Sequence, residues 1–551
     1  MTTRDDNIVA EEARAIEVGE ETGAGAPGAS GGSGRGRRDT WATHTGFILA
    51  CVGSAVGMAN IWLFPYRVAQ LGGAAFLIPY LIFVALLGFT GVIGEMSFGR
   101  AMGAGPMGAF GRAMEMRGVR HGERIGKIIG LVPTLGSLAI AIGYAVVLGW
   151  ACNYFVASLD GELMAQTDMG AFFGAIASDF GNVGFHLLGL ALTFGIMILG
   201  ISRGIERVNK VLMPTFFVLF VIIAIRVATL PGAAVGYEYL LVPRWEALLN
   251  PTTWVYALGQ AFFSLSLAGC GTLVYGSYLK RDVDVMDAAK NVAIFDTIAG
   301  LVAACVVVPA VFAFGLDVSS GPPLLFITLA QVFQEMPFGN IFAVILFAAV
   351  VFAAITSLLN LFEAPVEALQ AQLGLSRGVS VGIVAVLAVA VGLFLENGSS
   401  VSDWMDVISI YVIPVGAFLA AVMFFWVCPR GFAKKQAETG RKKPLGRWFD
   451  FMTRYVFVII TALVIVLGIF YGGIREGRGA KGKRRIAPTK AIPKPNTNTS
   501  RDMKRSERRE TLPRCRASPA AAASTPAQAM PSEEPKKNSP ADSPGCPIMP
   551  T

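Results

Sequence analysis

Two short segments rich in glycine and serine interrupt long apolar stretches of the chain, and they are its first candidates for chemistry. Residues 53–60 read Gly-Ser-Ala-Val-Gly-Met-Ala-Asn, and residues 264–271 read Ser-Leu-Ser-Leu-Ala-Gly-Cys-Gly. Backbone groups inside a membrane must be satisfied, so a helix can unwind there only where it lines a cavity or meets a ligand. The alternative is that these small residues only let helices pack closely.

Polar side chains in two further apolar stretches could also bind a ligand. Asp296 is the lone formal charge between residues 291 and 316, and an intramembrane carboxylate is costly unless it is paired with a cation. Alternatively, Asp296 lies at an interface or forms a hydrogen bond with a neighbouring helix. Thr356 and Ser357 offer hydroxyl oxygens, although such residues often bond back to the carbonyl one turn earlier.

The composition requires a membrane around these residues. Of 551 residues, 54% are hydrophobic and 15% are charged, and the mean hydropathy is +0.57. About 20 apolar residues suffice to cross a bilayer as a helix. We expect eleven transmembrane helices, at residues 46–65, 73–94, 128–159, 183–202, 211–225, 251–279, 291–316, 338–362, 378–395, 407–428 and 455–474.

The positions of lysine and arginine predict the orientation, because basic loops stay on the cytoplasmic side. The connection after the second span carries six basic residues, whereas the connection after the third carries four acidic residues and no basic one. Later loops alternate in the same way. The N-terminus is therefore expected to be cytoplasmic, in an inner (plasma) membrane that the chain crosses many times.

The ends of the chain differ in composition from its centre. Residues 1–39 predict a disordered cytosolic leader, residues 40–474 the membrane domain, and residues 475–551 a disordered basic tail. Eleven spans would place this tail outside, against the charge rule. The net charge of +8 is divided among loops and tail rather than gathered on one face, so no nucleic-acid partner is expected.

The two glycine-rich segments fall in the first and the sixth predicted spans. These are corresponding positions in two halves of five helices each. Paired interruptions of this kind indicate the binding site of a transporter built from inverted repeats. The pairing therefore favours a ligand site over simple close packing.

The residues around these segments resemble the signature of the neurotransmitter:sodium symporter family, whose bacterial members include sodium-dependent amino-acid transporters. The similarity covers roughly residues 41–471 and rests on these matches: Trp41-Ala42-Thr43, Gly53 to Gly57, Asn60, Phe64-Pro65-Tyr66, Gly72 to Phe76, Gly99-Arg100, Phe263 to Leu267, Tyr275, Tyr278 and Thr356-Ser357. It implies an all-α membrane protein with two inverted five-helix repeats, an eleventh helix, and discontinuous helices 1 and 6.

The resemblance implies two sodium sites. One would use the carbonyl of Ala55, the side chains of Asn60, Ser264 and Asp296, and the carboxylate of the substrate. The other would use the carbonyls of Gly53, Val56 and Ala353 and the hydroxyls of Thr356 and Ser357. Relatives that need chloride bind it near the first sodium. Asp296 could supply that negative charge, so we expect no chloride requirement.

The resemblance also implies where a substrate would bind. Its carboxylate would meet backbone amides of the broken first helix at Ala55 and Gly57, with the Tyr144 hydroxyl as a further donor. Phe263 would be an aromatic lid. The side-chain pocket would be lined by Met58, Ile140, Ser266, Gly269 and Leu361. Gly269 suggests room for a larger side chain, whereas Ala59 narrows the carboxylate end.

Two expected gates depart from the family pattern. At the outer gate Leu63 replaces an arginine, and Arg67 could reach Asp406 instead. Alternatively, Arg67 only extends its charged group to the interface between membrane and water. At the inner gate Arg38, Trp41 and Tyr278 match, but Ala371 takes the place of an acidic residue, and Glu367 is the nearest substitute.

We therefore expect a sodium-coupled symporter that imports an amino acid or related small solute by alternating access. The rival is a membrane sensor or regulatory protein that retains the fold without transporting. The chain has no GxxxxGK[ST] phosphate loop and no catalytic triad spacing, which argues against an enzyme or an ATP-driven pump. The expected partners are the substrate and the lipid bilayer.

Overall fold

The computed structural model describes residues 39–267, 270–316 and 323–471, and the regular elements in those ranges are all helical. Apart from Asp39, the predicted leader and tail lie outside them. The elements before the second glycine-rich segment are α2 (His44–Ala55), α3 (Met58–Ile61), α4 (Leu63–Gln70), α5 (Ala74–Leu87), η1 (Gly88–Val92), α6 (Ile93–Met102), α7 (Pro106–Met116), α8 (Gly122–Leu159), α9 (Glu162–Ala165), α10 (Met169–Ile176), α11 (Val183–Ile198), η2 (Ile201–Ile205), α12 (Glu206–Ala228), α13 (Ala233–Leu241) and η3 (Trp245–Leu249).

The second half of the described chain begins with the other interrupted helix. Its elements are α14 (Pro251–Ser264), α15 (Gly271–Gly276), α16 (Val285–Ala313), η4 (Leu324–Thr328), α17 (Leu329–Glu335), α18 (Gly339–Leu373), α19 (Arg377–Gly392), η5 (Leu393–Leu395), α20 (Gly398–Val407), η6 (Ile408–Val412), α21 (Ile413–Val422), η7 (Met423–Val427), α22 (Phe432–Glu438), α23 (Trp448–Phe451), η8 (Met452–Phe457) and α24 (Val458–Tyr471).

Within the described ranges, eight helices are long and apolar enough to cross a membrane, and α2 with the bent stretch Met58–Gln70 is a ninth candidate. The other two predicted spans are occupied by α11, of 16 residues, and by the interrupted pair α14 and α15. The predicted all-helical membrane fold is confirmed. The total of eleven spans and the inverted repeats stay predictions.

One helix runs well past its predicted span because a buried charge does not end a helix. The second span was predicted to stop at residue 94, but α6 continues to Met102 with Arg100 buried inside the fold. One guanidinium nitrogen of Arg100 donates to the Val283 carbonyl at 2.6 Å, and the other donates to the Gln436 carbonyl at 2.6 Å. The hydrogen bonds make the burial tolerable.

The first helix is broken as predicted. The Thr43 side chain caps its start by accepting from the Gly46 amide, and α2 ends at Ala55. Gly57 is extended, with φ −113° and ψ −176°. The helix resumes at Met58 after a bend of 60°. The Val56 amide still donates to the Val52 carbonyl and the Gly57 carbonyl accepts from the Asn60 amide, so the break releases the carbonyls of Ala55 and Val56 from the helical pattern.

The sixth predicted span is also broken. Asn250 caps α14 by accepting from the Thr252 amide, and Pro251 begins the helix, where a missing amide hydrogen costs least. After Ser264 the chain leaves the helical path. Ser266 and Cys270 have φ of +54° and +55°. Residues other than glycine rarely adopt this left-handed backbone conformation, and where they do, it tends to be at functional sites.

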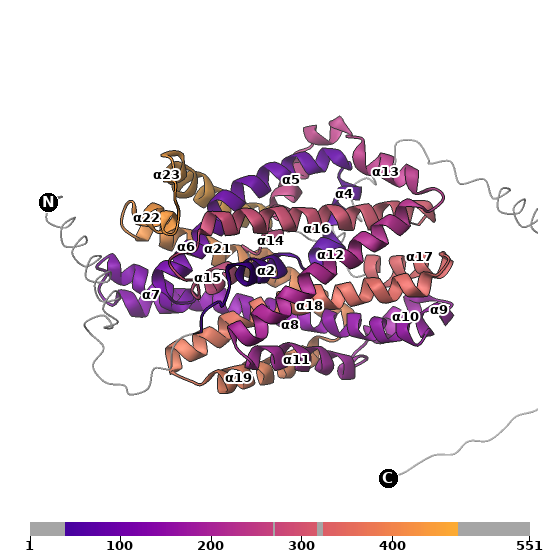
Figure 1. Ribbon diagram of the computed structural model, residues 1–551, viewed down its shortest axis with the longest axis horizontal. Helices are drawn as coiled ribbons and strands as arrows, with labels where there is room; N and C mark the ends of the chain where they lie inside the picture. The colour runs from indigo at the N-terminus through magenta and orange to yellow at the C-terminus, as the bar shows by residue number, and fades with distance from the viewer. Residues whose placement is uncertain (1–38, 268–269, 317–322, 472–551) are drawn as a thin grey trace, which may run out of the picture. The chain divides into compact units, whose positions relative to one another are not determined.

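The broken helices lie among the longest helices of the fold. In Figure 1, α2 lies over the region where α8 and α18 run together, and α2 contacts α12, α16 and α18. The α15 segment packs on α6 with the backbones in contact. A Cβ on Gly99 would lie 1.9 Å from the Leu273 carbonyl, and one on Gly276 would lie 2.5 Å from that of Met96. Glycine is required at both positions.

Candidate functional site

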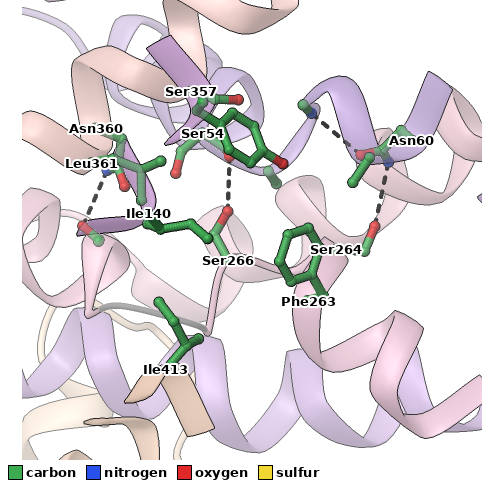
Figure 2. A pocket seen from close by; sticks show the side chains of 15 residues that line it. Ser54, Asn60, Ile140, Phe263, Ser264, Ser266, Ser357, Asn360, Leu361 and Ile413 are labelled. Carbon is green, nitrogen blue, oxygen red and sulfur yellow. Dashed lines mark hydrogen bonds between the residues drawn. The ribbon is translucent and has the colours of Figure 1, made fainter. Parts of the chain in front are cut away.

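A cavity opens where the two broken helices face each other. It encloses about 530 Å³ of space that protein atoms do not fill, part of it continuous with solvent. Figure 2 shows the side chains that line it, and they come from α2, α3, α8, α14, α15, α18 and α21. The lining residues are Ser54, Ala55, Gly57, Ala59, Asn60, Ile140, Tyr144, Phe263, Ser264, Ser266, Gly271, Ser357, Asn360, Leu361 and Ile413.

Three predicted ligands of the first ion site meet at one edge of this cavity. The Ser264 hydroxyl lies 2.8 and 2.7 Å from the two carboxylate oxygens of Asp296. The Asn60 amide donates to Asp296 Oδ1 at 2.8 Å and lies 3.3 Å from the Ser264 oxygen. The three residues come from α3, α14 and α16, so only the folded chain brings them together.

The environment of Asp296 fits a cation. Its side chain is fully buried, and the hydrogen-bond partners described above are an amide and a hydroxyl, neither of which carries a positive charge. A buried carboxylate is expensive unless an opposite charge compensates it. A hard cation prefers several oxygen ligands at once. Asn60, Ser264 and Asp296 supply such a set beside the broken first helix.

The predicted residues of the second ion site also meet. The Ser357 hydroxyl lies 3.4 Å from the Gly53 carbonyl oxygen. The Thr356 hydroxyl lies 3.1 Å from the Ala353 carbonyl oxygen. Val56 ends α2 with φ −76° and ψ 87°, outside the helical range. Oxygen atoms from both sides of the α2–α18 contact therefore converge. The Thr356 hydroxyl is also 3.1 Å from the Phe352 carbonyl, the back-bonding alternative.

Asn209 of α12 was missed by sequence reasoning and adjoins this second set. A Cβ built on Gly53 would lie 2.2 Å from Asn209 Oδ1 and 3.0 Å from Thr356 Cβ. The amide donates from Nδ2 to the Ile205 carbonyl at 2.8 Å, whereas the buried Oδ1 has no hydrogen-bond partner in the described chain. Glycine at position 53 is therefore required for α12 to approach α2.

The predicted carboxylate end is formed by three residues from different helices. A Cβ on Gly57 would lie 2.9 Å from the Ser357 hydroxyl oxygen and 4.0 Å from the Tyr144 hydroxyl oxygen. The Gly57 amide donates to Asn60 Oδ1 at 3.3 Å. The Tyr144 hydroxyl therefore lies near the backbone of Gly57, next to the first ion cluster, whereas the Gly57 amide and the Ser357 hydroxyl already donate to Asn60 and Gly53.

Of the predicted pocket residues, Ala55, Gly57, Ile140, Tyr144, Phe263, Ser266 and Leu361 line the cavity. Met58 does not: its side chain is fully buried and absent from the lining, because it points into the core at the start of α3. Gly269 lies outside the described residues. Ser266 donates to the Ser54 carbonyl at 2.8 Å and so joins the two breaks. Asn360 and Ile413 line the cavity without having been predicted.

The described contacts of Arg67 lie on α14. Its side chain is 2% exposed. One guanidinium nitrogen donates to Gln260 Oε1 at 2.9 Å, and the guanidinium carbon lies 5.4 Å from the centre of the Tyr256 ring. Leu63 is buried one turn earlier. These contacts place Arg67 inside the fold on the side of the cavity where α14 begins, whereas its expected partnership with Asp406 stays a prediction.

Two of the predicted inner-gate residues have clear partners. The Trp41 indole donates to the Tyr275 carbonyl at 3.0 Å, and the two rings lie 5.1 Å apart, edge to face. The Tyr278 hydroxyl donates to Glu363 at 2.9 Å. Arg377 forms a two-pronged ion pair with the same carboxylate, at 2.9 Å on each oxygen. Arg38 lies outside the described residues.

Glu363, one turn before Glu367, is therefore the acidic partner of Tyr278 in the described structure. Glu367 is buried against Gly105, where a Cβ would lie 2.1 Å from its carboxylate. The predicted role of Glu367 at the inner gate stays a prediction, because Arg38 lies outside the described residues. An acidic residue directly after a predicted apolar span, at residue 363, was the signal that could have identified Glu363.

Glu206 holds the start of the first helix and was also missed. Its carboxylate accepts from the amides of Ala42 and Thr43, at 2.7 and 3.1 Å, and from the Thr43 hydroxyl at 2.7 Å. Lys210, one turn later on α12, lies 2.7 Å from the same carboxylate. Together with Trp41, this contact fixes the beginning of α2 at two points. The spacing of Glu206 and Lys210 in the sequence does not indicate this contact.

Comparisons with known proteins agree with this geometry. A sequence model described as the sodium:neurotransmitter symporter family matches residues 38–171 and 171–477. An uncharacterised sodium-dependent transporter of Bacillus subtilis, YhdH, is 30% identical over 446 residues, which are 78% of this chain and 96% of that protein. A second one, from Methanocaldococcus jannaschii, is 30% identical over 469 residues, 80% of this chain and 93% of its own.

A solved structure has the same fold. The crystal structure of MhsT in complex with L-phenylalanine superposes with a TM-score of 0.69 at 32% sequence identity. The similarity covers 78% of this chain and 99% of MhsT.

Proposed function

The chain belongs to the sodium:neurotransmitter symporter family, and from that premise we propose that it imports an amino acid or related small solute together with sodium by alternating access. Members of this family are transporters rather than enzymes, and the apolar helices make this chain a multi-pass membrane protein. We place it in the plasma (inner) membrane with a cytoplasmic N-terminus, in accordance with its basic loops.

One observation carries the proposal. The fully buried carboxylate of Asp296 is bonded to Asn60 and Ser264. Both of these residues line the cavity, as do Ala55 and Gly57 at the break of the first helix. A sodium ion there could share a ligand with the substrate carboxylate. A shared ligand makes each bind more tightly in the presence of the other, by the same free energy.

We propose two sodium ions for each substrate. The second would bind among Gly53, Val56, Ala353, Thr356 and Ser357, at the contact of α2 with α18. An ion at that contact holds the two helices together. A sensor that does not transport would have less need of two complete oxygen sets, so these clusters favour transport.

Substrate binding is expected to require sodium. Purified protein should bind at least one of the twenty amino acids in sodium buffer and bind it at least about tenfold more weakly in potassium. Thr356→Ala should raise the sodium concentration for half-saturation about tenfold, because it removes one ligand of a multidentate site. Isothermal titration calorimetry measures both.

Thr193 of α11 provides a matched control, because its hydroxyl is also buried and donates to the carbonyl one turn earlier, at 2.9 Å. Thr193→Ala should leave the sodium dependence unchanged. Equal binding in potassium and sodium would rule out the coupling. Equal effects of the two threonine substitutions would make Thr356 a structural residue.

A further inference from the structure

The cavity has polar groups at two separate ends. Figure 2 shows Asn60 and Ser264 on one side and Asn360 with Leu361 on the opposite side. The first end contains the predicted ion and carboxylate groups. The second end has no role in that prediction. A cavity with a second polar end can distinguish ligands by the far end of their side chains.

Asn360 is held in a fixed orientation. Its side chain is 1% exposed, and Nδ2 donates to the Gly271 carbonyl at 3.2 Å. Because only the NH₂ group can donate to a carbonyl, this bond fixes which side of the amide is oxygen. The oxygen is then an acceptor at the surface of the cavity.

Gly271 leaves that oxygen accessible. Both residues line the cavity, and a Cβ built on Gly271 would lie only 1.9 Å from Asn360 Oδ1. Any side chain at position 271 would therefore occupy the space in front of the amide oxygen. A ligand that brings a donor to this point gains a hydrogen bond to the amide oxygen.

The walls between the two polar ends are mostly apolar, with Ile140 of α8, Phe263 of α14, Leu361 of α18 and Ile413 of α21. Ser266 also lies between the ends, and its hydroxyl already donates to the Ser54 carbonyl. A ligand that reaches from one end to the other must therefore have an apolar body. We propose that the substrate is an amino acid with a large, mostly apolar side chain that ends in a hydrogen-bond donor, and that Asn360 Oδ1 accepts from that donor.

Phenol and indole side chains have this chemistry. Tyrosine carries an O–H at the far end of an aromatic ring, and tryptophan carries an N–H. Phenylalanine has the same ring without the donor, so it would leave the amide oxygen unsatisfied. A site built to bond a substrate hydroxyl discriminates strongly against the analogue that lacks it. Asn360 is thus a specificity-determining residue, and this inference rests on the proposed function.

The test compares ligands that differ only at that position. Dissociation constants of L-tyrosine, L-phenylalanine and 4-fluoro-L-phenylalanine are measured by calorimetry in sodium buffer with the full-length protein. L-Tyrosine is expected to bind about tenfold more tightly than the other two, because one hydrogen bond is gained and the phenol loses its bonds to water. This series needs no variant. Equal affinities, or tighter binding of L-phenylalanine, would overturn the proposal.

Variants then assign the effect to Asn360. Asn360→Leu keeps the branching at Cγ but removes both hydrogen-bonding groups, and it should reduce the affinity for L-tyrosine to that for L-phenylalanine. Asn360→Asp keeps an acceptor and should retain the preference. Ile140→Val alters the apolar wall and should weaken both ligands equally. A tyrosine preference that survives in Asn360→Leu would place the recognition elsewhere.

The same measurements separate this inference from the proposed function. If L-phenylalanine binds in sodium as tightly as L-tyrosine, sodium-coupled amino-acid binding stands and only the role of Asn360 is overturned. If none of the twenty amino acids binds in sodium, both are overturned.

Discussion

Replacing Asp296 with asparagine is expected to reduce sodium-dependent uptake by about a hundredfold or more in chloride-free buffer. The carboxylate is fully buried and bonded to Asn60 and Ser264. At an effective dielectric constant of 20, one charge 4 Å from the ion contributes about 4 kcal/mol. This Coulomb energy greatly exceeds the roughly 1 kcal/mol of a neutral hydrogen bond that asparagine could retain.

Wild-type uptake should not depend on chloride, because Asp296 provides the negative charge beside the first sodium. In Asp296→Asn, chloride could occupy that place, so added chloride should restore part of the uptake. Glu396→Gln is the matched control: Glu396 is equally buried but pairs with His186 at 3.0 Å, on helix α11. A chloride requirement in the wild type, or normal uptake by Asp296→Asn without chloride, would contradict this account.

The second large effect is expected at the replaced outer gate. Leu63 cannot donate a hydrogen bond, yet a carrier must close its outer side before it opens inward. We propose that Arg67 and Asp406 take part in this closure. Arg67 is buried and bonded to Gln260, and α20 carries Asp406. Loss of a hydrogen bond to a charged group costs about 2 kcal/mol, so Arg67→Ala should slow uptake about thirtyfold.

A double-mutant cycle tests whether the two residues act together. Arg67→Ala and Asp406→Ala should each slow uptake more than they weaken sodium binding, because they shift the conformational equilibrium. The second loss should add little to the first. Arg244→Ala is a control, since that guanidinium stacks 3.8 Å above Tyr239 on another element. Strict additivity, or normal uptake by Arg67→Ala, would indicate closure by apolar packing around Leu63 and Phe263.

The broken helices could be predicted from the sequence because their cause is local. Glycine and serine residues concentrate at 53–60 and 264–271, and both interruptions lie there in the structure. Asp296 and Asn60 could also be identified as candidates, because a polar side chain in an apolar span is costly unless it has a binding partner. That they belong to one site was implied by the family resemblance rather than by any local pattern, and in the structure the Asn60 amide lies 2.8 Å from the Asp296 carboxylate.

The contacts at the helix ends could not be predicted, because they join residues far apart in the chain. Glu206 bonds the start of α2 from 163 positions away, and no feature of its own segment indicates that partner. Asn360 sits in an apolar helix like many packing residues. Its importance depends on Gly271 lying opposite. The part of α6 after residue 94 was missed because hydropathy decreases at Arg100, although carbonyl groups of the fold accept hydrogen bonds from that side chain.

Uptake into liposomes under an imposed sodium gradient tests the central claim most directly. Purified protein is reconstituted in vesicles that contain potassium, and each of the twenty amino acids is supplied outside in sodium buffer. We predict that at least one, L-tyrosine among them, accumulates inside above its outside concentration, and that a sodium ionophore abolishes the accumulation. Sodium-independent equilibration of that amino acid, or no uptake of any of them by protein that is correctly folded, would contradict sodium-coupled import.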